Sequence, residues 1–212
     1  MMMKSRFALV TIACLGTLLT LNMGAVPDKK NASSTNPSLP PGWTEEDMKA
    51  AILAGTPGEM HKHLNNSVGV WHGKNKMWMA PGAEAIESEC TSIVSPIMEG
   101  RFTKCEMTGE MPGMGTYNGF GLYGFDNVSQ KFTCTWIDNH GTGMMNGIGE
   151  LSADGKVTTW NFTVNCPLTG KPTVVREIET ITGPTTKTLD MFSNDPKSGK
   201  EYKMMSIDFT KK

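Results

Sequence analysis

Apolar and polar residues alternate along most of this chain after about residue 68. The segment from Gly119 to Gly143 shows the pattern best: aromatic residues alternate with small or polar ones up to residues 126–127, and the alternation resumes between Phe132 and Trp136. A period of two that is interrupted by turn-forming residues predicts a β-hairpin with one buried face. We therefore predict an antiparallel β-structure for most of the chain.

Turn signals recur at regular intervals through this region. They lie at nine places, near residues 80–82, 95–96, 112–113, 126–127, 139–141, 154–155, 168–170, 183–184 and 195–199. Nine turns delimit about ten strands of roughly 7–10 residues, which favours a sandwich or a barrel. A series of neighbouring hairpins favours the barrel, because closure leaves no exposed edge strand. The predicted fold class is all-β: an antiparallel up-and-down barrel over residues 67–212.

A short helical segment over residues 44–66 precedes the predicted barrel. Thr44 followed by three acidic residues is typical of a helix N-terminus, and it predicts a helix from about Glu45 to Ala54 that ends before Gly55. A second helix is predicted over residues 59–65. Residues 26–43 are polar and rich in proline, which predicts a disordered linker.

The first 25 residues have the pattern of a secretory signal peptide. Lys4 and Arg6 form a basic start, residues 7–21 are apolar, and small residues follow at Gly24 and Ala25. An alternative interpretation places a lipid anchor on Cys14. No later run approaches the ~18 apolar residues that span a bilayer. We therefore expect an exported protein, secreted or periplasmic, without a membrane-spanning segment.

The charge balance argues against one class of partner. The chain has 20 basic and 21 acidic residues, and without Lys4 and Arg6 the balance is 18 against 21, or −3. No block of basic residues is interleaved with aromatic ones. Nucleic acid is therefore not expected as a partner.

Four cysteines follow the leader, and export would make disulfides available to them. If the turn at residues 95–100 joins two antiparallel strands, Cys90 and Cys105 lie opposite each other, with Cβ atoms ~5 Å apart. That is within bonding reach. Cys134 and Cys166 then pair by elimination, and the alternative is two buried thiols. No CxxC or paired Cys/His spacing indicates a structural zinc site.

Charged residues occupy successive positions, and hence both faces, of two predicted strands. They include Glu87 and Glu89 on one strand, and Arg176, Glu177 and Glu179 on another. One interpretation is an exposed surface ladder. The other is a polar group inside the barrel, where an unpaired charge costs several kcal/mol. In that case Arg176 pairs with an inward carboxylate, and the pair either stabilises the barrel or binds a ligand.

Candidate chemistry is sparse. Nucleophile motifs such as Gly-x-Ser-x-Gly and glycine-rich phosphate loops are absent. Glu87 with Glu89, or Glu177 with Glu179, offers two carboxylates ~6.6 Å apart along one strand face, although surface carboxylates explain them equally well. No catalytic residue, cofactor or metal ligand is assigned from the sequence.

Methionine and histidine each allow two interpretations. Five methionines lie in two predicted loop regions, where thioethers suit either Cu(I) or adaptable packing: Met107, Met111, Met114, Met144 and Met145. His140 lies in a predicted turn. It is either a solvated histidine or the single axial ligand of a haem.

An ordered set of motifs carries a family resemblance. PGEMHKHL at residues 57–64 and VGVW at 68–71 are followed by GRF at 100–102, GFGLYGFDN at 119–127, TWID at 135–138, GTG at 141–143 and PLTGK at 167–171. In this order they resemble the exported bacterial family called domain of unknown function 1579, over residues 57–212. The resemblance implies a calycin-like barrel, and Gly69-Val70-Trp71 resembles the Gly-x-Trp of the first lipocalin strand. That family has no settled activity, so the resemblance implies a fold rather than a function.

The function we expect is the binding of a small, partly apolar molecule inside the barrel, by analogy with the fold. The expected wall and its polar anchors are Trp71, Phe120, Leu122, Trp136, Trp160, Phe162, Arg176 and Glu177. One alternative is a hydrolase-type enzyme that uses paired carboxylates on an envelope substrate, and another is copper binding through methionine. The sequence does not identify the ligand, the oligomeric state or the strand face that lines the interior.

Overall fold

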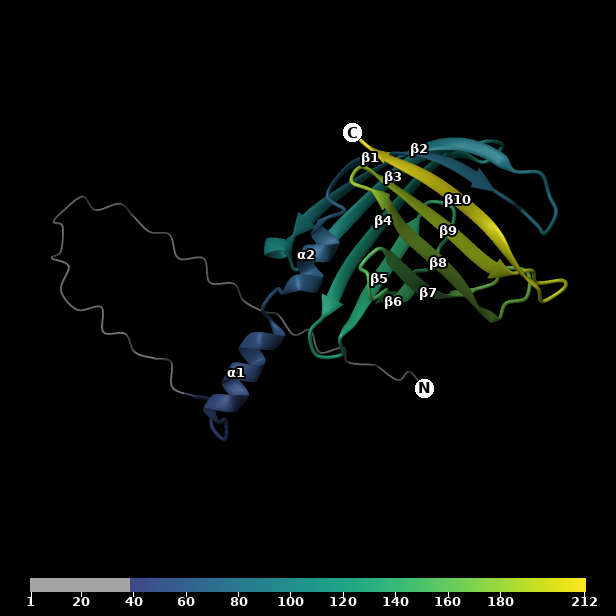
Figure 1. Cartoon of the computed structure of the whole chain (residues 1–212). Coiled ribbons are helices and arrows are strands. Elements are labelled where there is room, and N and C mark those ends of the chain that lie inside the picture. The colour runs from purple at the N-terminus through teal and green to yellow at the C-terminus, as the bar shows by residue number, and fades with distance from the viewer. Residues whose placement is uncertain (1–38) are drawn as a thin grey trace, which may run out of the picture. The chain divides into compact units, whose positions relative to one another are not determined.

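The computed structural model describes residues 39–212, which form a closed barrel of ten antiparallel strands (Figure 1). The strands are β1 (Gly69–Met77), β2 (Ile86–Ile97), β3 (Phe102–Met111), β4 (Gly115–Asp126), β5 (Lys131–Asp138), β6 (Met145–Leu151), β7 (Val157–Asn165), β8 (Pro172–Gly183), β9 (Thr186–Asn194) and β10 (Glu201–Lys211). Each strand pairs with its neighbours in sequence, and β1 pairs with β10. The predicted up-and-down barrel is confirmed. The signal peptide predicted over residues 1–25 and most of the linker predicted over residues 26–43 lie outside the described residues.

Two helices precede the barrel, over the ranges that the sequence predicted: α1 (Glu45–Ala54) and α2 (Glu59–Asn65). The start of α1 is a capping box. The Asp47 N–H donates to Thr44 Oγ1 (3.1 Å), and the Thr44 N–H donates back to Asp47 Oδ2 (2.8 Å). None of the helices that the structure describes is long and apolar enough to cross a membrane.

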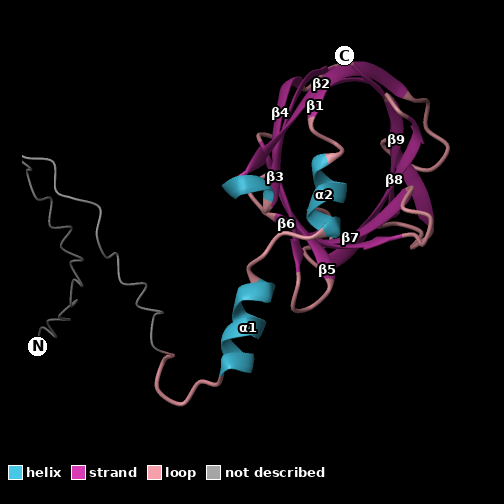
Figure 2. Cartoon of the chain, turned by 60° about the vertical axis from the view of Figure 1, so that its left-hand side comes forward, coloured by secondary structure: helices cyan, strands magenta, loops and turns pink. Residues whose placement is uncertain are grey.

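Helix α2 lies across one end of the barrel (Figure 2). Its first turn is fixed by His61, whose Nδ1 accepts a hydrogen bond from the Gly58 N–H (3.0 Å) and whose ring packs edge-on against Phe125. Its last turn is held by Asn65, whose Nδ2 donates to the Gly100 carbonyl (3.1 Å). The first turn of the helix therefore contacts the barrel through His61, and its last turn contacts the β2–β3 connection through Asn65.

The inward faces of the strands build two hydrophobic clusters inside the barrel. One contains Trp71, Val94, Cys105, Ile207 and Phe209. The other contains Phe132, Cys134, Trp160, Phe162 and Val175. The first set comes from four strands and the second from three, so burial of these side chains favours the closed barrel over separate hairpins.

Glycines at inward positions make room for the aromatic rings. Gly149 lies directly opposite Trp160, and Gly147 opposite Phe162. A Cβ on Gly149 would lie 2.7 Å from Cε3 of Trp160, and one on Gly147 would lie 2.6 Å from Cδ1 of Phe162. The flat rings therefore occupy the space above these glycines, which is the packing reason for the Gly-x-Gly spacing on β6.

The turn between β2 and β3 differs from the predicted one. Its reversal is made by Met98, Glu99 and Gly100, whose φ values of 48°, 58° and 80° are left-handed. The predicted turn spanned residues 95–100, so the observed reversal lies at the end of the predicted one. The register consequently sets Cys90 opposite Gly109, and Cys105 opposite Val94.

The predicted disulfide between Cys90 and Cys105 is therefore wrong. The two cysteines lie four positions out of register on neighbouring strands. Cys90, Cys105, Cys134 and Cys166 are all unbonded thiols. The pairing of Cys134 with Cys166, which depended on the first bridge, is absent as well.

Candidate ligand-binding cavity

The barrel encloses a cavity of about 290 Å³. All ten strands contribute to its wall, and His63 and Leu64 of α2, with Ser67, line the end that the helix covers. Most of the lining is apolar or aromatic. A largely apolar cavity with a few polar groups is typical of small-molecule sites, and this volume is near the lower end of their range of about 300–1,000 Å³.

Four of the eight residues expected to bind a ligand line this cavity: Trp136, Trp160, Phe162 and Glu177. Trp71 is buried inside the barrel beside the cavity, where its Nε1 donates to the Ser67 carbonyl (2.8 Å). It therefore contributes to the packed end of the barrel instead of to the cavity wall.

The other three expected residues lie on the outer face. Phe120 and Leu122 are 38% and 39% exposed, because Gly119 and Gly121 take the inward positions of β4. The ring of Trp136 fills the space above these two glycines. The large side chains of the Gly-Phe-Gly-Leu sequence therefore had to face outward.

Arg176 also lies outside the barrel. Its guanidinium forms two hydrogen bonds with Glu201 of β10 (2.8 and 3.1 Å) and lies over the ring of Phe192. The expectation that Arg176 anchors a ligand is therefore replaced by a role on the surface, where it joins three strands. Glu177, its neighbour in sequence, faces the interior.

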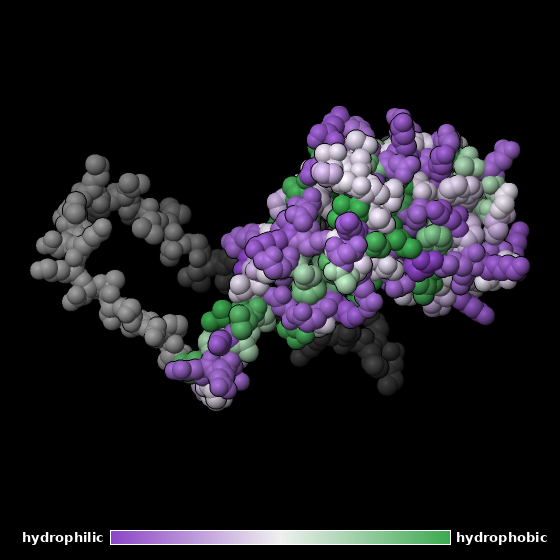
Figure 3. Space-filling view, viewed as in Figure 1, coloured by the Kyte–Doolittle hydropathy of each residue, from purple (hydrophilic) through white to green (hydrophobic). Residues whose placement is uncertain are grey.

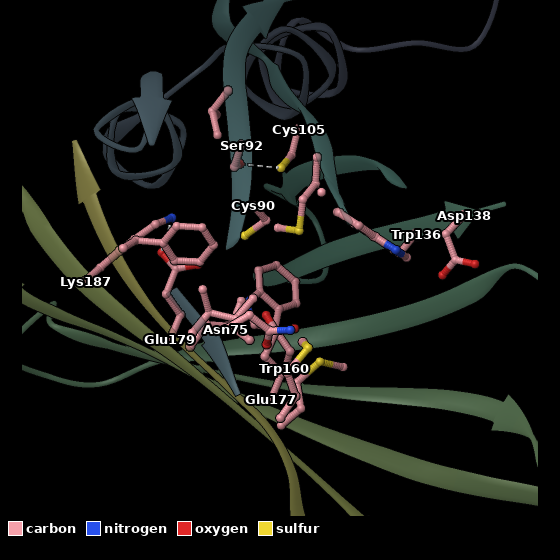
Figure 4. A pocket seen from close by; sticks show the side chains of 18 of the residues that line it. Asn75, Cys90, Ser92, Cys105, Trp136, Asp138, Trp160, Glu177, Glu179 and Lys187 are labelled. Carbon is pink, nitrogen blue, oxygen red and sulfur yellow. Dashed lines mark hydrogen bonds and ion pairs between the residues drawn. The ribbon is translucent and has the colours of Figure 1, made fainter. Parts of the chain in front are cut away.

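A polar cluster lies inside the barrel, formed by Glu177, Glu179, Lys187 and His63 (Figure 4 labels the first three). Lys187 Nζ donates to Glu179 Oε1 (3.1 Å) and lies 4.9 Å from the centroid of the Trp71 ring. Burial lowers the pKa of His63, and the negative charge of Glu179 acts weakly in the opposite direction. His63 therefore remains neutral near pH 7.

Glu177 is the unusual member of this cluster. It is only 7% exposed, and it makes no hydrogen bond or ion pair with any residue that the structure describes. Burial raises its pKa to about 8; the charge of Glu179 adds to the shift and that of Lys187 opposes it. At neutral pH most of the Glu177 side chains therefore carry a proton, and no side chain among residues 39–212 pairs with this carboxyl.

A second unpartnered polar atom, Asn75 Oδ1, also belongs to a residue of the lining. The amide Nδ2 of Asn75 donates to Ser88 Oγ (3.1 Å), whereas Oδ1 is buried and accepts no hydrogen bond in the described part of the chain. Near the end away from α2, Trp136 Nε1 donates to the Tyr117 hydroxyl (3.0 Å), which in turn donates to Asp138 Oδ2 (3.4 Å).

Sulfur is abundant in the cavity wall. Cys105 Sγ lies 3.1 Å from Ser92 Oγ, and burial raises the pKa of the nearby Cys90 thiol to about 11. Both thiols are therefore neutral and unreactive near pH 7. Within residues 39–212, no group of three or more His, Cys, Asp or Glu side chains is arranged to hold a metal ion.

The five methionines that suggested copper do not share one environment. Met107, Met111 and Met145 line the cavity, while Met114 and Met144 are exposed outside it. His140 also lies outside the cavity, in the turn after β5, where its N–H donates to Asp138 Oδ1 (2.9 Å).

Sequence reasoning missed Lys187 and Asn75. A signal for both existed in the alternation: Lys187 is in phase with Leu189 and Met191, and Asn75 is in phase with Trp71. A polar residue that occupies an apolar phase is a candidate for the interior. Adjacent charges, such as those at residues 176–177, are a weaker signal because they fall on both faces of a strand.

Comparison with known proteins supports the fold. A sequence-family model described as "Protein of unknown function (DUF1579)" matches residues 56–211. No curated protein sequence matches the chain. The crystal structure of Rv2717c from M. tuberculosis is similar with a TM-score of 0.56 and 12% identity, covering 74% of this chain and 99% of that one. The S-type phycobiliprotein lyase CPES from Guillardia theta is similar with a TM-score of 0.51 and 10% identity, covering 76% and 96%. Identities this low support the barrel fold alone.

Proposed function

The chain belongs to the DUF1579 family of proteins of unknown function, and we propose that it binds a small, partly apolar molecule inside its barrel. The observation that carries this proposal is the unpartnered carboxyl of Glu177 in a cavity walled by Trp160, Phe162 and Phe132. Buried polar groups in folded proteins nearly always have a hydrogen-bond partner. A ligand that enters the cavity supplies the partner that residues 39–212 do not.

The cavity also supports the proposal because an unfilled cavity lowers the stability of the barrel. Packing that filled the barrel with side chains would gain dispersion and remove the void. Instead, all ten strands contribute to a wall around about 290 Å³, and flexible Met191, Met204 and Met205 lie in it. Unbranched thioether side chains adapt to the shape of a bound molecule.

Native mass spectrometry of the protein purified from its own host tests the proposal. We expect a co-purified small molecule, released on denaturation. The variant Met145→Trp narrows the cavity from β6 and should remove this molecule. Ile148→Trp adds the same ring to the outer face of the same strand, where the native side chain is exposed, and should retain it.

Two results would count against ligand binding. The first is a native mass equal to that of the chain alone, together with no binding of neutral aromatic alcohols in a calorimetric titration. The second is equal loss of a bound molecule in Met145→Trp and Ile148→Trp, since the outer substitution leaves the cavity unchanged.

A hydrolase-type activity is the second candidate, because one observation favours it. Glu177 and Glu179 share the inner face of β8, and burial raises the pKa of Glu177 to about 8 while Glu179 is paired with Lys187. Two neighbouring carboxyls in different environments are the arrangement of a general acid and its partner. Chromogenic esters and glycosides test this. Turnover that is equal in the wild type and Glu177→Gln would exclude it.

Export is a further part of the proposal, supported by the basic and apolar pattern of the first 25 residues. We expect the mature protein to begin near residue 26 and to be secreted or periplasmic. Amino-terminal sequencing of the protein from host fractions measures both. A full-length chain in the cytoplasmic fraction would contradict it.

A further inference from the structure

Acidic groups outnumber basic ones around the cavity. Three carboxyl side chains in the inward phase of their strands line it, together with a single lysine among the described residues: Asp138, Glu177, Glu179 and Lys187. Lys187 is already paired with Glu179, and His63 is neutral near pH 7 because burial lowers its pKa. A ligand with a negative charge would therefore meet net repulsion, whereas a cation would be attracted.

The barrel already holds one ammonium group in its interior. Lys187 Nζ lies between the Glu179 carboxylate at 3.1 Å and the Trp71 ring at 4.9 Å from the centroid. A carboxylate on one side and an aromatic face on the other is a favourable environment for a desolvated cation.

Glu177 lies two residues before Glu179 on the same face of β8, and it also has a neighbouring aromatic ring, but it has no neighbouring ammonium group among the described residues. Glu177 lies directly opposite Trp160 on β7, as an acid beside an aromatic ring. On β9, Glu177 is opposite Met191, so the position that corresponds to Lys187 is occupied by Leu189. The described part of the chain therefore supplies no basic side chain to Glu177, although the cavity lies beside it.

The unpartnered atoms require hydrogen-bond donors. Asn75 Oδ1 is a buried acceptor that receives no hydrogen bond from residues 39–212, and a deprotonated Glu177 offers acceptors only. An alkyl ammonium carries three donors and no acceptor, so it matches this set without leaving a polar atom of its own unsatisfied.

We propose that the ligand of this cavity is an amphipathic organic cation, in which a protonated amine pairs with Glu177 and an apolar body packs against Trp160 and Phe162. This inference rests on the proposed function, since it requires that the barrel binds a small molecule. It adds the chemical class of that molecule and the residue that selects it.

Binding of such a cation is coupled to the release of a proton from Glu177. Glu177 has its pKa raised to about 8, so it releases its proton to the solvent when it pairs with the ammonium. The groups that face or lie near it are Glu179 on β8, Lys187 on β9, Tyr123 on β4, Cys105 on β3, Cys134 on β5 and His63 on α2. Burial raises the pKa of Tyr123 and of both thiols, so these three stay neutral and Glu177 titrates first among the uncharged acids.

Three probes with one aromatic body test the inference: naphthylmethylamine, naphthalenemethanol and naphthoic acid, titrated calorimetrically into the full chain. We expect the amine to bind about tenfold tighter than the alcohol near pH 7.5, and the acid to bind most weakly. The affinity for the amine should rise by about twentyfold between pH 6 and pH 7.5, with release of about one proton, because Glu177 loses its proton on binding while alkyl amines stay protonated over this range.

A matched pair of variants assigns the effect to Glu177. In Glu177→Gln the preference for the amine over the alcohol should fall to about threefold or less, with the affinity for the alcohol unchanged. Glu150→Gln removes a carboxylate from the outside of β6, where it pairs with Lys131, and should leave the preference intact. Proton release is measured on the wild type, so it decides the question even if Glu177→Gln does not fold.

The outcomes separate the two proposals. If the alcohol binds as tightly as the amine, or if no proton is released, the cationic ligand is excluded while small-molecule binding stands. If none of the three probes binds, both proposals fail. If the acid binds most tightly, the charge argument is overturned and Lys187 becomes the group to test.

Discussion

Lys187 and Glu179 form an ion pair in the interior of the barrel, with Nζ 3.1 Å from Oε1. The two side chains are among the least exposed of the ion pairs that the structure describes, at 11% and 23%. They belong to neighbouring strands β9 and β8, so the pair also joins a hairpin on its inner face. Its position beside Glu177 links the stability of the barrel to the chemistry of the cavity.

Removal of the lysine should destabilise the protein. Lys187→Met leaves Glu179 largely buried without its cation, and we expect the free energy of unfolding to fall by about 1–3 kcal/mol. The double variant Lys187→Met/Glu179→Gln should recover most of the loss, because the unpaired charge is then absent. Urea denaturation near pH 7 measures both.

The control for this ion pair lies on the outer surface. Lys131 pairs with Glu150 at 2.6 Å, but both are well exposed. Lys131→Met should therefore cost less than about 1 kcal/mol. An equal loss in Lys131→Met and Lys187→Met would show that burial of the inner pair has no energetic consequence.

Glu177 should make stability depend on pH. Its pKa is about 8 in the folded protein against an ordinary value of 4.5, so below pH 4.5 both states are protonated and the group imposes no cost. As the pH rises from 4.5 to 8, the unfolded chain loses its proton first, and stability is lost over this window. Glu177→Gln has no such loss of stability, so the advantage in unfolding free energy of this variant over the wild type should grow to roughly 4 kcal/mol near pH 8.

Urea denaturation of both proteins at several pH values between 4.5 and 8 gives this difference directly, since other titrating groups cancel. Glu106→Gln, which changes a carboxyl on the outer face of β3, serves as the control and should show no growing advantage. A constant difference between Glu177→Gln and the wild type would contradict the raised pKa.

The glycines beneath the aromatic rings should be sensitive to a single added methyl group. Gly149→Ala places a Cβ 2.7 Å from Trp160 Cε3, so the ring must move, and we expect a loss of about 1–3 kcal/mol in unfolding free energy. In Gly143→Ala no atom lies within 4 Å of the new Cβ, and stability should be unchanged or slightly raised. Thermal denaturation followed by tryptophan fluorescence compares the two, and similar stabilities would refute the packing of Trp160 on Gly149.

Thiol reactivity should distinguish the four cysteines. Burial raises the pKa of Cys90, Cys105 and Cys134, whereas hydrogen bonds from Thr169 and Leu168 lower the pKa of Cys166. In protein lacking residues 1–25, we expect a disulfide-exchange reagent to label Cys166 rapidly and the other three only after unfolding.

The same experiment checks the absence of disulfides. Alkylation under denaturing conditions should give the same mass with and without a reductant, with all four thiols modified. Cys166→Ser should abolish the rapid phase. Rapid labelling of two or more thiols in the folded protein would contradict their burial.

Much of the fold followed from local signals. The alternation around Phe132 and Trp136 predicted strands, and the spacing of Gly, Pro, Asn and Asp divided them correctly into ten within the described residues. Thr44 and the acids after it predicted the start of α1. These signals are local, because hydrogen bonding and side-chain direction within a strand, a turn or a helix end depend on a few neighbouring residues.

The candidate site was only partly predictable. Alternation shows which residues share a strand face, and it placed Trp160 and Phe162 together on β7. It does not show which face is the inner one. On β4 the large residues Phe120 and Leu122 face outward, because Gly119 and Gly121 are needed beneath Trp136, a residue of the next strand.

The amino-acid sequence by itself determined that the chain forms regularly spaced hairpins and helix caps, since these depend on contacts within a few residues. The tertiary structure decided the register that separates Cys90 from Cys105, through the left-handed residues Met98 and Glu99. It also decided that Lys187 neutralises Glu179 and leaves Glu177 alone. Such relationships depend on how strands far apart in the chain align when the barrel closes, and closure is driven by the burial of the interior as a whole.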